Sequence, residues 1–171
     1  IAVVAKDTLH ATASQAGLAV GIYIIGTVVA RLLAGRFISI LGCRKMLYVG
    51  LLIYLASTAM YFYTPNLLIL DSVRFLNGFA YGITSTATST IVAAIIPMSR
   101  RGEGINYYGL STSLAAAVGP FLGILMLHTV GYDFIIAFCV ALIILCVIGA
   151  VIMKFKEPNL AIESERHKGI R

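Results

Sequence analysis

The sequence predicts an all-α membrane protein, a helical bundle of five transmembrane helices, and three observations support this fold class. Of the 171 residues, 60% are hydrophobic and only 12% are charged, roughly half the charged fraction of an ordinary soluble domain. Mean hydropathy is +0.95. The apolar residues form long runs, each close to the about 20 residues that a membrane-spanning helix needs. Because few charges are available to cover a surface in water, the composition excludes a soluble enzyme, a nucleic-acid-binding domain and a disordered chain.

Five apolar runs are the expected membrane spans, and each is too long and too uniformly apolar to be a sheet strand. The first run contains one charge, Arg31, near its end, and the third carries Asp71 and Arg74 in its first turns. The second, fourth and fifth runs are uncharged. In chain order the predicted spans are residues 17–35, 46–64, 67–97, 105–130 and 134–153.

The positions of Lys and Arg predict the orientation of the spans. The loops after the first and third spans and the C-terminal tail are basic, whereas the opposite side has only Lys6. Because basic loops stay in the cytoplasm, we expect a multi-pass plasma-membrane protein with a cytoplasmic C-terminus. The net charge of +6 then reflects these loops and no nucleic-acid partner. Tyrosines at the span ends are expected to anchor the bilayer interface: Tyr61, Tyr63 and Tyr132 outside, and Tyr48, Tyr107 and Tyr108 inside.

The third span carries the most informative charges. Asp71 and Arg74 are three residues apart, so they share a helix face and could form an ion pair. A charge inside a membrane helix costs a few kcal/mol on insertion scales and usually marks a transport pathway or a proton relay. The alternative is that both side chains lie at headgroup level and reach the interface. We expect Arg74, the deeper residue, to be the functional one.

Small and polar residues continue along the same span. Gly78 and Gly82 follow Arg74 at intervals of four, a spacing that lets another helix approach closely. Asn77, Tyr81 and Thr88 add a neighbouring strip of hydrogen-bonding groups. Since a lipid-facing helix gains nothing from such residues, they are candidates to line a cavity, and helix–helix packing is the alternative.

Motifs of catalysis and metal binding are absent from the sequence. It contains no His-Glu-x-x-His, no Gly-x-Ser-x-Gly, no phosphate-binding loop and no Gly-x-Gly-x-x-Gly. Cys43 lies in a predicted basic loop, and Cys139 and Cys146 on one helix are about 10.5 Å apart along its axis, too far to bridge. We therefore expect no enzyme, no disulfide framework and no metal or organic cofactor.

Three local motifs together resemble those of the major facilitator superfamily. The segment between the first two spans resembles the family's loop signature, but Ser39 stands where the family has Asp, and Ile40 and Cys43 where it usually has Arg. The third span has the Arg-x-x-x-Gly pattern of the family's fourth helix, and the fourth span resembles its antiporter signature, with Ala115 in place of the first glycine. The matching residues are Gly35, Gly42, Arg44 and Lys45 in the loop, Arg74 and Gly78 in the third span, and Gly119, Pro120 and Gly123 in the fourth.

The resemblance implies that the five spans are helices 2–6 of a twelve-helix transporter. Residues 1–153 would then be a partial N-terminal six-helix bundle, with residues 1–5 as the outer end of the preceding helix, and 154–171 would begin the cytoplasmic central linker. The first helix and the C-terminal bundle would be missing partners. In this family substrate binds near the midplane between two bundles that rock against each other.

The resemblance also implies roles for individual residues. The family's fourth-helix arginine is associated with proton coupling through an acid in the first helix; Arg74 is the matching residue and Asp71 a local substitute. Ser39 supplies no charge for the contact that the family's loop acid makes with the opposite bundle. The Gly119, Pro120 and Gly123 motif accompanies exporters more than importers.

These implications lead to a functional expectation. The chain is expected to be part of a secondary active transporter, a multidrug-type antiporter that exports small organic compounds by alternating access, with the proton as coupling ion. A nutrient or metabolite uptake carrier of the same fold and a non-transporting membrane scaffold are the alternatives. The expected partners are a small-molecule substrate and membrane lipid.

Overall fold

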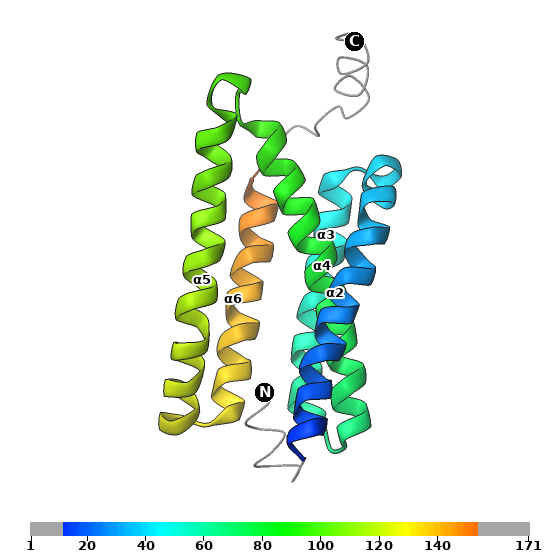
Figure 1. The fold of residues 1–171 in the computed structure, drawn as a ribbon, viewed down its shortest axis with the longest axis vertical. Helices are drawn as coiled ribbons and strands as arrows, with labels where there is room; N and C mark the ends of the chain where they lie inside the picture. Colours follow the sequence, from blue (N-terminus) through cyan, green and yellow to red (C-terminus); the bar gives the residue numbers. More distant parts are fainter. Residues whose placement is uncertain (1–11, 154–171) are drawn as a thin grey trace.

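The computed structural model describes residues 12–153, and the predicted preceding span end (1–5) and linker (154–171) lie outside the described residues. Every regular element in the described part is helical, as the sequence predicts, and the long helices run roughly side by side (Figure 1). The helices are α2 (Ala13–Leu41), α3 (Cys43–Ala59), α4 (Leu67–Ile95), α5 (Arg101–Thr129) and α6 (Tyr132–Ile152), with the 3₁₀ turns η1 (Met60–Tyr63) and η2 (Met98–Arg100).

Local sequence explains where the helices begin and end. Thr12 caps α2: its hydroxyl accepts a hydrogen bond from the Gln15 amide at 3.3 Å, and the Gln15 side chain accepts one from the Thr12 amide at 2.9 Å. Helix α4 ends at Ile95 because Ile96 precedes Pro97 and takes the extended conformation that a following proline favours. The predicted spans therefore match the helices to within a turn or two.

The predicted loop between the first two spans is largely helical, which corrects the sequence interpretation. Residues 36–41 contain no helix breaker, so α2 continues to Leu41 and α3 begins at Cys43. Only Gly42 separates the two helices, with φ of 85°, a left-handed conformation that glycine adopts without steric cost. Its amide donates to the Ile38 carbonyl at 3.0 Å and closes α2. Cys43, expected in a loop, is buried at 1% exposure.

Helices α2, α3 and α4 form the tightly packed part of the bundle, with α4 against both of the others. Glycines allow the close approach: a Cβ on Gly78 would collide with the Tyr23 carbonyl, and a Cβ on Gly82 would lie 2.7 Å from the Thr27 carbonyl. The Thr27 hydroxyl donates to the Gly78 carbonyl at 3.0 Å and adds a hydrogen bond between the two helices. The small-residue stripe on the third span thus packs helices, as its spacing predicts.

Helices α5 and α6 stand beside this three-helix unit (Figure 1). Helix α6 packs against α3 and contributes Ile136 to a core with Tyr61, Leu70 and Val73. Helix α5 has no buried residue. Its contacts with α4 and α6 are sparse. Most of its apolar surface is therefore open to lipid or to further protein.

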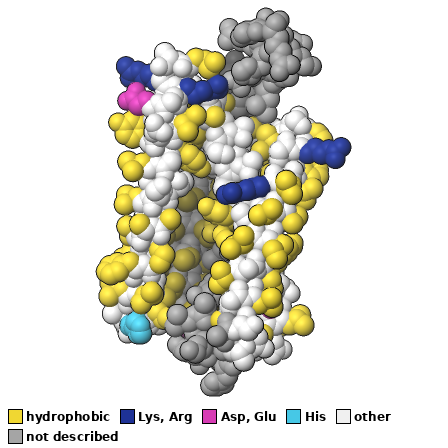
Figure 2. Space-filling model, viewed as in Figure 1, with side chains coloured by type: hydrophobic (Ala, Val, Ile, Leu, Met, Phe, Trp, Pro, Cys, Tyr) yellow, Lys and Arg dark blue, Asp and Glu magenta, His cyan; other side chains and the backbone are white. Residues whose placement is uncertain are grey.

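Four segments of the described chain are long and apolar enough to cross a membrane: Ser14–Leu41, Cys43–Tyr63, Met98–Thr129 and Tyr132–Ile152. Helix α4 is as long as α2, at 29 residues, but its charged and hydroxyl residues lower its hydropathy. Hydrophobic side chains cover most of the length of the visible face (Figure 2). The polar helix α4 lies against the apolar ones, an arrangement expected of a membrane bundle.

Candidate functional site

Among the described residues, two cavities with different linings lie beside α4. The larger is an open groove of about 630 Å³ between α2, α4 and α5. The smaller, of about 250 Å³, lies among α2, α3, α4 and α6. Arg74 and Asn77 line the smaller cavity and Tyr81 lines the groove, so the polar strip predicted on one face is divided between two spaces.

Arg74 borders the smaller cavity and contacts α2. Its Nε donates a hydrogen bond to the Ala19 carbonyl at 3.2 Å, and its guanidinium carbon lies 4.9 Å from the centre of the Tyr23 ring. A cation over a tyrosine ring is attracted by about 0.5–2 kcal/mol, more as water is excluded. The side chain is partly buried. Arg74 is thus held by a helix other than its own, beside a cavity.

Asp71 and Arg74 do not form the pair that their spacing allows: the part of the chain that the structure describes contains no ion pair between them. Arg74 extends to α2 instead, where a carbonyl and an aromatic ring are available. The Asp71 Oδ1 atom is buried and has no hydrogen-bond partner among the described residues. A buried polar oxygen without a hydrogen-bond partner costs free energy.

Tyrosines form most of the polar wall of the smaller cavity. Tyr61 is 4% exposed, and Tyr132 is half-buried. Both were expected to anchor the outer interface, and instead they face inward because α6 packs over η1. Tyr63 is 84% exposed, consistent with an anchor. The residues around this cavity are Tyr23, Tyr54, Thr58, Tyr61, Arg74, Asn77, Tyr132, Ile135, Ile136 and Cys139.

Asn77 links α4 to α3 beside the same cavity. It is 6% exposed, and its Nδ2 donates to the Ser57 hydroxyl at 3.1 Å and to the Thr58 hydroxyl at 3.0 Å. Both hydroxyls donate in turn to the Tyr54 carbonyl. Asn77 therefore packs helices as well as lining a cavity, so both interpretations of its pattern apply.

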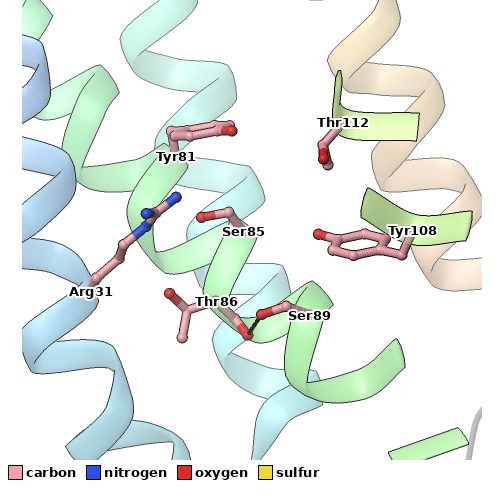
Figure 3. A pocket seen from close by; sticks show the side chains of 7 residues that line it. All are labelled: Arg31, Tyr81, Ser85, Thr86, Ser89, Tyr108 and Thr112. Carbon is pink, nitrogen blue, oxygen red and sulfur yellow. Dashed lines mark hydrogen bonds between the residues drawn. The ribbon is translucent and has the colours of Figure 1, made fainter. Parts of the chain in front are cut away.

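The groove is lined from three helices. Arg31 comes from α2, Tyr81 and Ser85 from α4, and Tyr108 and Thr112 from α5 (Figure 3). Thr86 and Ser89 of α4 complete the lining. Thr88, a candidate from the sequence, is not among the residues that line these two cavities, and its hydroxyl donates to the Thr84 carbonyl at 2.8 Å.

The loop-signature residues lie where α2 meets α3. The Ser39 hydroxyl donates to the Arg36 carbonyl of its own helix at 2.7 Å. Arg44 lies with its guanidinium carbon 5.8 Å from the centre of the Tyr48 ring. The Tyr48 hydroxyl donates to the Ala150 carbonyl at 3.0 Å and connects α3 to the end of α6. Gly35 and Lys45 are exposed, and a Cβ on Gly35 would have open space.

The residues of the antiporter signature lie on α5, which continues as one helix through Pro120. A Cβ on Gly119 or Gly123 would meet no atom within 4 Å. Pro120 is exposed. No described residue therefore packs closely against these two glycines.

The sequence interpretation gave no role to Arg31 and did not predict the smaller cavity with its tyrosine lining. Arg31 was visible as the one charge in an otherwise apolar first span, which is itself the sign of a functional position. The signal for Tyr23 and Tyr54 was weaker, because tyrosine in a span is compatible with several environments. Their ring centres lie 6.1 Å and 6.3 Å from that of Tyr81, so the three rings form a continuous row.

The site has the chemistry of polar side chains in an apolar bundle. Among residues 12–153, no group of three or more His, Cys, Asp and Glu side chains could hold a metal ion. The cysteines of the described chain form no disulfide bond with one another. Long apolar helices around a helix that carries buried polar groups define a multi-pass integral membrane protein.

The particular family follows from comparison with known proteins. The model of the Major Facilitator Superfamily matches residues 1–170. The chain belongs to this superfamily of transporters.

Several relatives have names that describe transport. An uncharacterized MFS-type transporter of Methanocaldococcus jannaschii, MJ1560, is 27% identical over 95% of this chain and 41% of its own length. Multidrug resistance protein 2 of Bacillus subtilis is 26% identical over 67% of this chain and 29% of its own length. YncC of the same organism, provisionally named a metabolite transport protein, is 33% identical over 72% of this chain and 27% of its own length. The chain spans about two fifths or less of these relatives.

Proposed function

We propose that the complete protein is a proton-coupled exporter of small organic compounds that works by alternating access. The observation that carries this proposal is Arg74, a permanently charged side chain held by α2 at the edge of a cavity inside the bundle. Such a charge stabilises a nearby carboxylate in its ionised form. When the bundles move and the distance changes, that carboxylate releases or binds a proton.

Proton coupling through Arg74 also requires a nearby carboxylate whose protonation its charge affects. Asp71 lies one turn away, and its buried Oδ1 atom has no hydrogen-bond partner among residues 12–153. A second acid on the preceding helix, as the family resemblance implies, would complete the relay. We propose that the preceding helix and a C-terminal bundle pack against the open groove and the exposed face of α5. One of these two partners would then contact the surface formed by Gly119, Pro120 and Gly123.

The orientation proposed for the chain follows the charges. The α2–α3 and α4–α5 connections lie at one end of the bundle (Figure 1), and Lys and Arg side chains gather at that end of the visible face (Figure 2). By the positive-inside rule this end is cytoplasmic in a plasma membrane. Arg74 then lies in the outer half and Arg31 in the inner half.

Two candidate directions of transport have support among the relatives. The similarity to Multidrug resistance protein 2 favours export of structurally varied organic compounds. The similarity to YncC, provisionally named for metabolite transport, favours uptake of a metabolite. The antiporter-like residues Gly119, Pro120 and Gly123 on α5 favour export. A scaffold without transport has less support, because both cavities are lined by polar groups.

The proposal is tested by replacing Arg74 in the complete protein. Cells are loaded with a fluorescent dye, and export is followed with and without an uncoupler. Arg74→Ala should abolish uncoupler-sensitive export but leave the amount of protein in the membrane unchanged, and Arg74→Lys should restore part of it. Arg100→Ala is the matched control, because Arg100 is exposed in η2 and lines neither cavity. Unchanged export by Arg74→Ala would refute proton coupling through this residue.

A further inference from the structure

We propose that Arg101 fixes the angle between α4 and α5, so that the two helices move as one rigid hairpin during transport. The inference rests on the proposed function, because it gives Arg101 a positioning role in alternating access. Arg101 is the first residue of α5, and only Ile96, Pro97 and the turn η2 separate it from the end of α4. The contacts described below hold this connection and do not depend on what packs against the groove.

The end of α4 has a backbone carbonyl that lacks its helical donor. In an α-helix each carbonyl accepts from the amide four residues ahead, and for Ala93 that residue is Pro97, which has no N–H. Ile96 has already left the helix, with φ of −73° and ψ of 127°. Ala93 is only partly exposed. Because an unpaired backbone carbonyl away from water costs free energy, the Ala93 carbonyl needs a donor from elsewhere.

Arg101 provides this donor. Its Nε lies 3.3 Å and its Nη2 lies 3.0 Å from the Ala93 carbonyl oxygen, so two N–H groups of one guanidinium donate to a single acceptor. A hydrogen bond from a charged donor is about twice as strong as a neutral one. A cation is favourable at the C-terminal end of α4 but unfavourable in the first turn of its own helix α5. The position of Arg101 is therefore explained by α4: the side chain that begins α5 caps the helix before it.

Packing in the same connection holds the start of α5 against the end of α4. A Cβ on Gly104 would lie 2.9 Å from Cγ1 of Ile96, so a larger residue there would displace the isoleucine. The Arg100 amide donates to the Pro97 carbonyl at 3.0 Å and closes the 3₁₀ turn. The connection is thus held by a side-chain cap, a backbone turn and a packed side chain. It forms a corner rather than a flexible loop.

The α4 side of this corner is attached to the core of the bundle. Ala87 and Ile91 are buried, at 0% and 5% exposure, in a core that also contains residues of α2 and α3. Helix α5 therefore takes its direction from a fixed support. It has 29 residues and extends about 44 Å, so a change of about 5° in the angle between the helices displaces its far end by about 4 Å. The two helices keep their relative positions during transport only if the corner holds.

The first test measures the angle between the two helices in the complete protein. Spin labels are placed at Leu68 and Thr129, exposed residues at the ends of α4 and α5 that lie far from the corner, in a background without other reactive cysteines. Double electron–electron resonance in nanodiscs then gives the distance between the labels. In wild type this distance should be the same with and without dye, and a change on adding dye would overturn the rigid hairpin.

The variant that removes the cap is Arg101→Met, which keeps the aliphatic part of the side chain and loses the donors. It should widen the distribution of label distances by about 3 Å or more, the displacement that a few degrees produce at the end of α5. Arg100→Met is the matched control, because Arg100 is an exposed arginine of the same connection. It should leave the distribution unchanged.

Three further variants keep the test decisive should Arg101→Met fail to fold. Gly104→Val places a side chain against Ile96 and should widen the distribution, whereas Gly102→Val, where a Cβ has open space, should not. Arg101→Lys keeps the charge but loses the planar fork of donors, so it should widen the distribution less than Arg101→Met. A wild-type distribution in Arg101→Lys would show that charge alone is required and would overturn the cap.

The second test measures export per molecule of protein in the membrane. Arg101→Met should lower the uncoupler-sensitive turnover by about threefold to tenfold, the factor that corresponds to one lost hydrogen bond. The dye concentration at half-maximal export should not change, because Arg101 is not among the described residues that line either cavity. A role in folding alone would lower the amount of protein and leave the turnover per molecule unchanged. Arg100→Met should export at the wild-type rate.

The combined results separate this inference from the proposed function. Unchanged distances in both Arg101→Met and Gly104→Val would overturn the corner, whatever the effect on export. Wider distances with wild-type turnover would overturn the positioning role. If Arg101→Met widens the distances of a protein whose wild type shows no uncoupler-sensitive export, the corner is supported and the proposed function is refuted.

Discussion

The glycine contact between α2 and α4 gives the sharpest test of the packing. In Gly78→Ala the new Cβ would overlap the Tyr23 carbonyl, which is backbone and has no rotamer to change. The helices must separate, and overpacking of this kind costs about 1–3 kcal/mol. Separation also weakens the 3.0 Å hydrogen bond from the Thr27 hydroxyl to the Gly78 carbonyl, worth about 0.6 kcal/mol between membrane helices. The higher helix propensity of alanine than of glycine offsets up to about 1 kcal/mol of this loss of stability. The net expected loss of stability is about 0.6–2.6 kcal/mol.

The assay compares two glycine variants in detergent. Gly119→Ala is the matched control, because Gly119 is also inside a long helix and a Cβ there meets nothing within 4 Å. Unfolding by sodium dodecyl sulfate is followed by circular dichroism, since the sequence has no tryptophan to report by fluorescence. Gly78→Ala should unfold at a lower detergent fraction than wild type, and Gly119→Ala at an equal or higher one. Equal midpoints for the two variants would refute the close approach.

Two further variants test the helix junction and the buried amide. Gly42→Ala should destabilise by about 1–2 kcal/mol in the same assay, because φ is 85° there and an L side chain is strained in that region; a midpoint equal to that of Gly35→Ala would contradict this. Asn77→Leu should cost about 1 kcal/mol by removing two interhelical hydrogen bonds, whereas Asn77→Gln should lose less if its amide still reaches Ser57. An equal loss of stability in Asn77→Leu and Asn77→Gln would indicate that side-chain volume, and not hydrogen bonding, determines the cost.

Composition and apolar run length were sufficient to predict the helical elements. The hydrocarbon core of the bilayer sets the length of an apolar run and requires apolar side chains, and both properties are found directly in the sequence. Helix ends were harder, because a helix can continue past the membrane until a breaker stops it. Residues 36–41 were interpreted as loop for their basic surroundings, but Gly42 is the first residue that ends α2.

The candidate site was predicted only in part, because the sequence does not say which helices meet. The spacing of Gly78 and Gly82 predicted a close contact, and the structure identifies the partner as α2. The spacing of Asp71 and Arg74 predicted a pair, but side chains choose among all neighbours, and Arg74 contacts Ala19 and Tyr23 of α2. Such long-range choices depend on packing, which periodicity does not encode.

Helical geometry explains why one polar strip serves two cavities. Residues spaced by four advance about 40° around an α-helix of 3.6 residues per turn. The residues spaced by four along α4 are Asn77, Tyr81, Ser85 and Ser89. From the first to the last of them the strip therefore turns by about 120° around the helix and rises about 18 Å along it. It faces α3 and α6 at the Asn77 end and α5 at the Ser89 end, in agreement with the lining of the two cavities. On α2, Ala19, which accepts from Arg74, and Arg31 are also about 18 Å apart along the axis. The two arginines thus lie at different depths and beside different cavities.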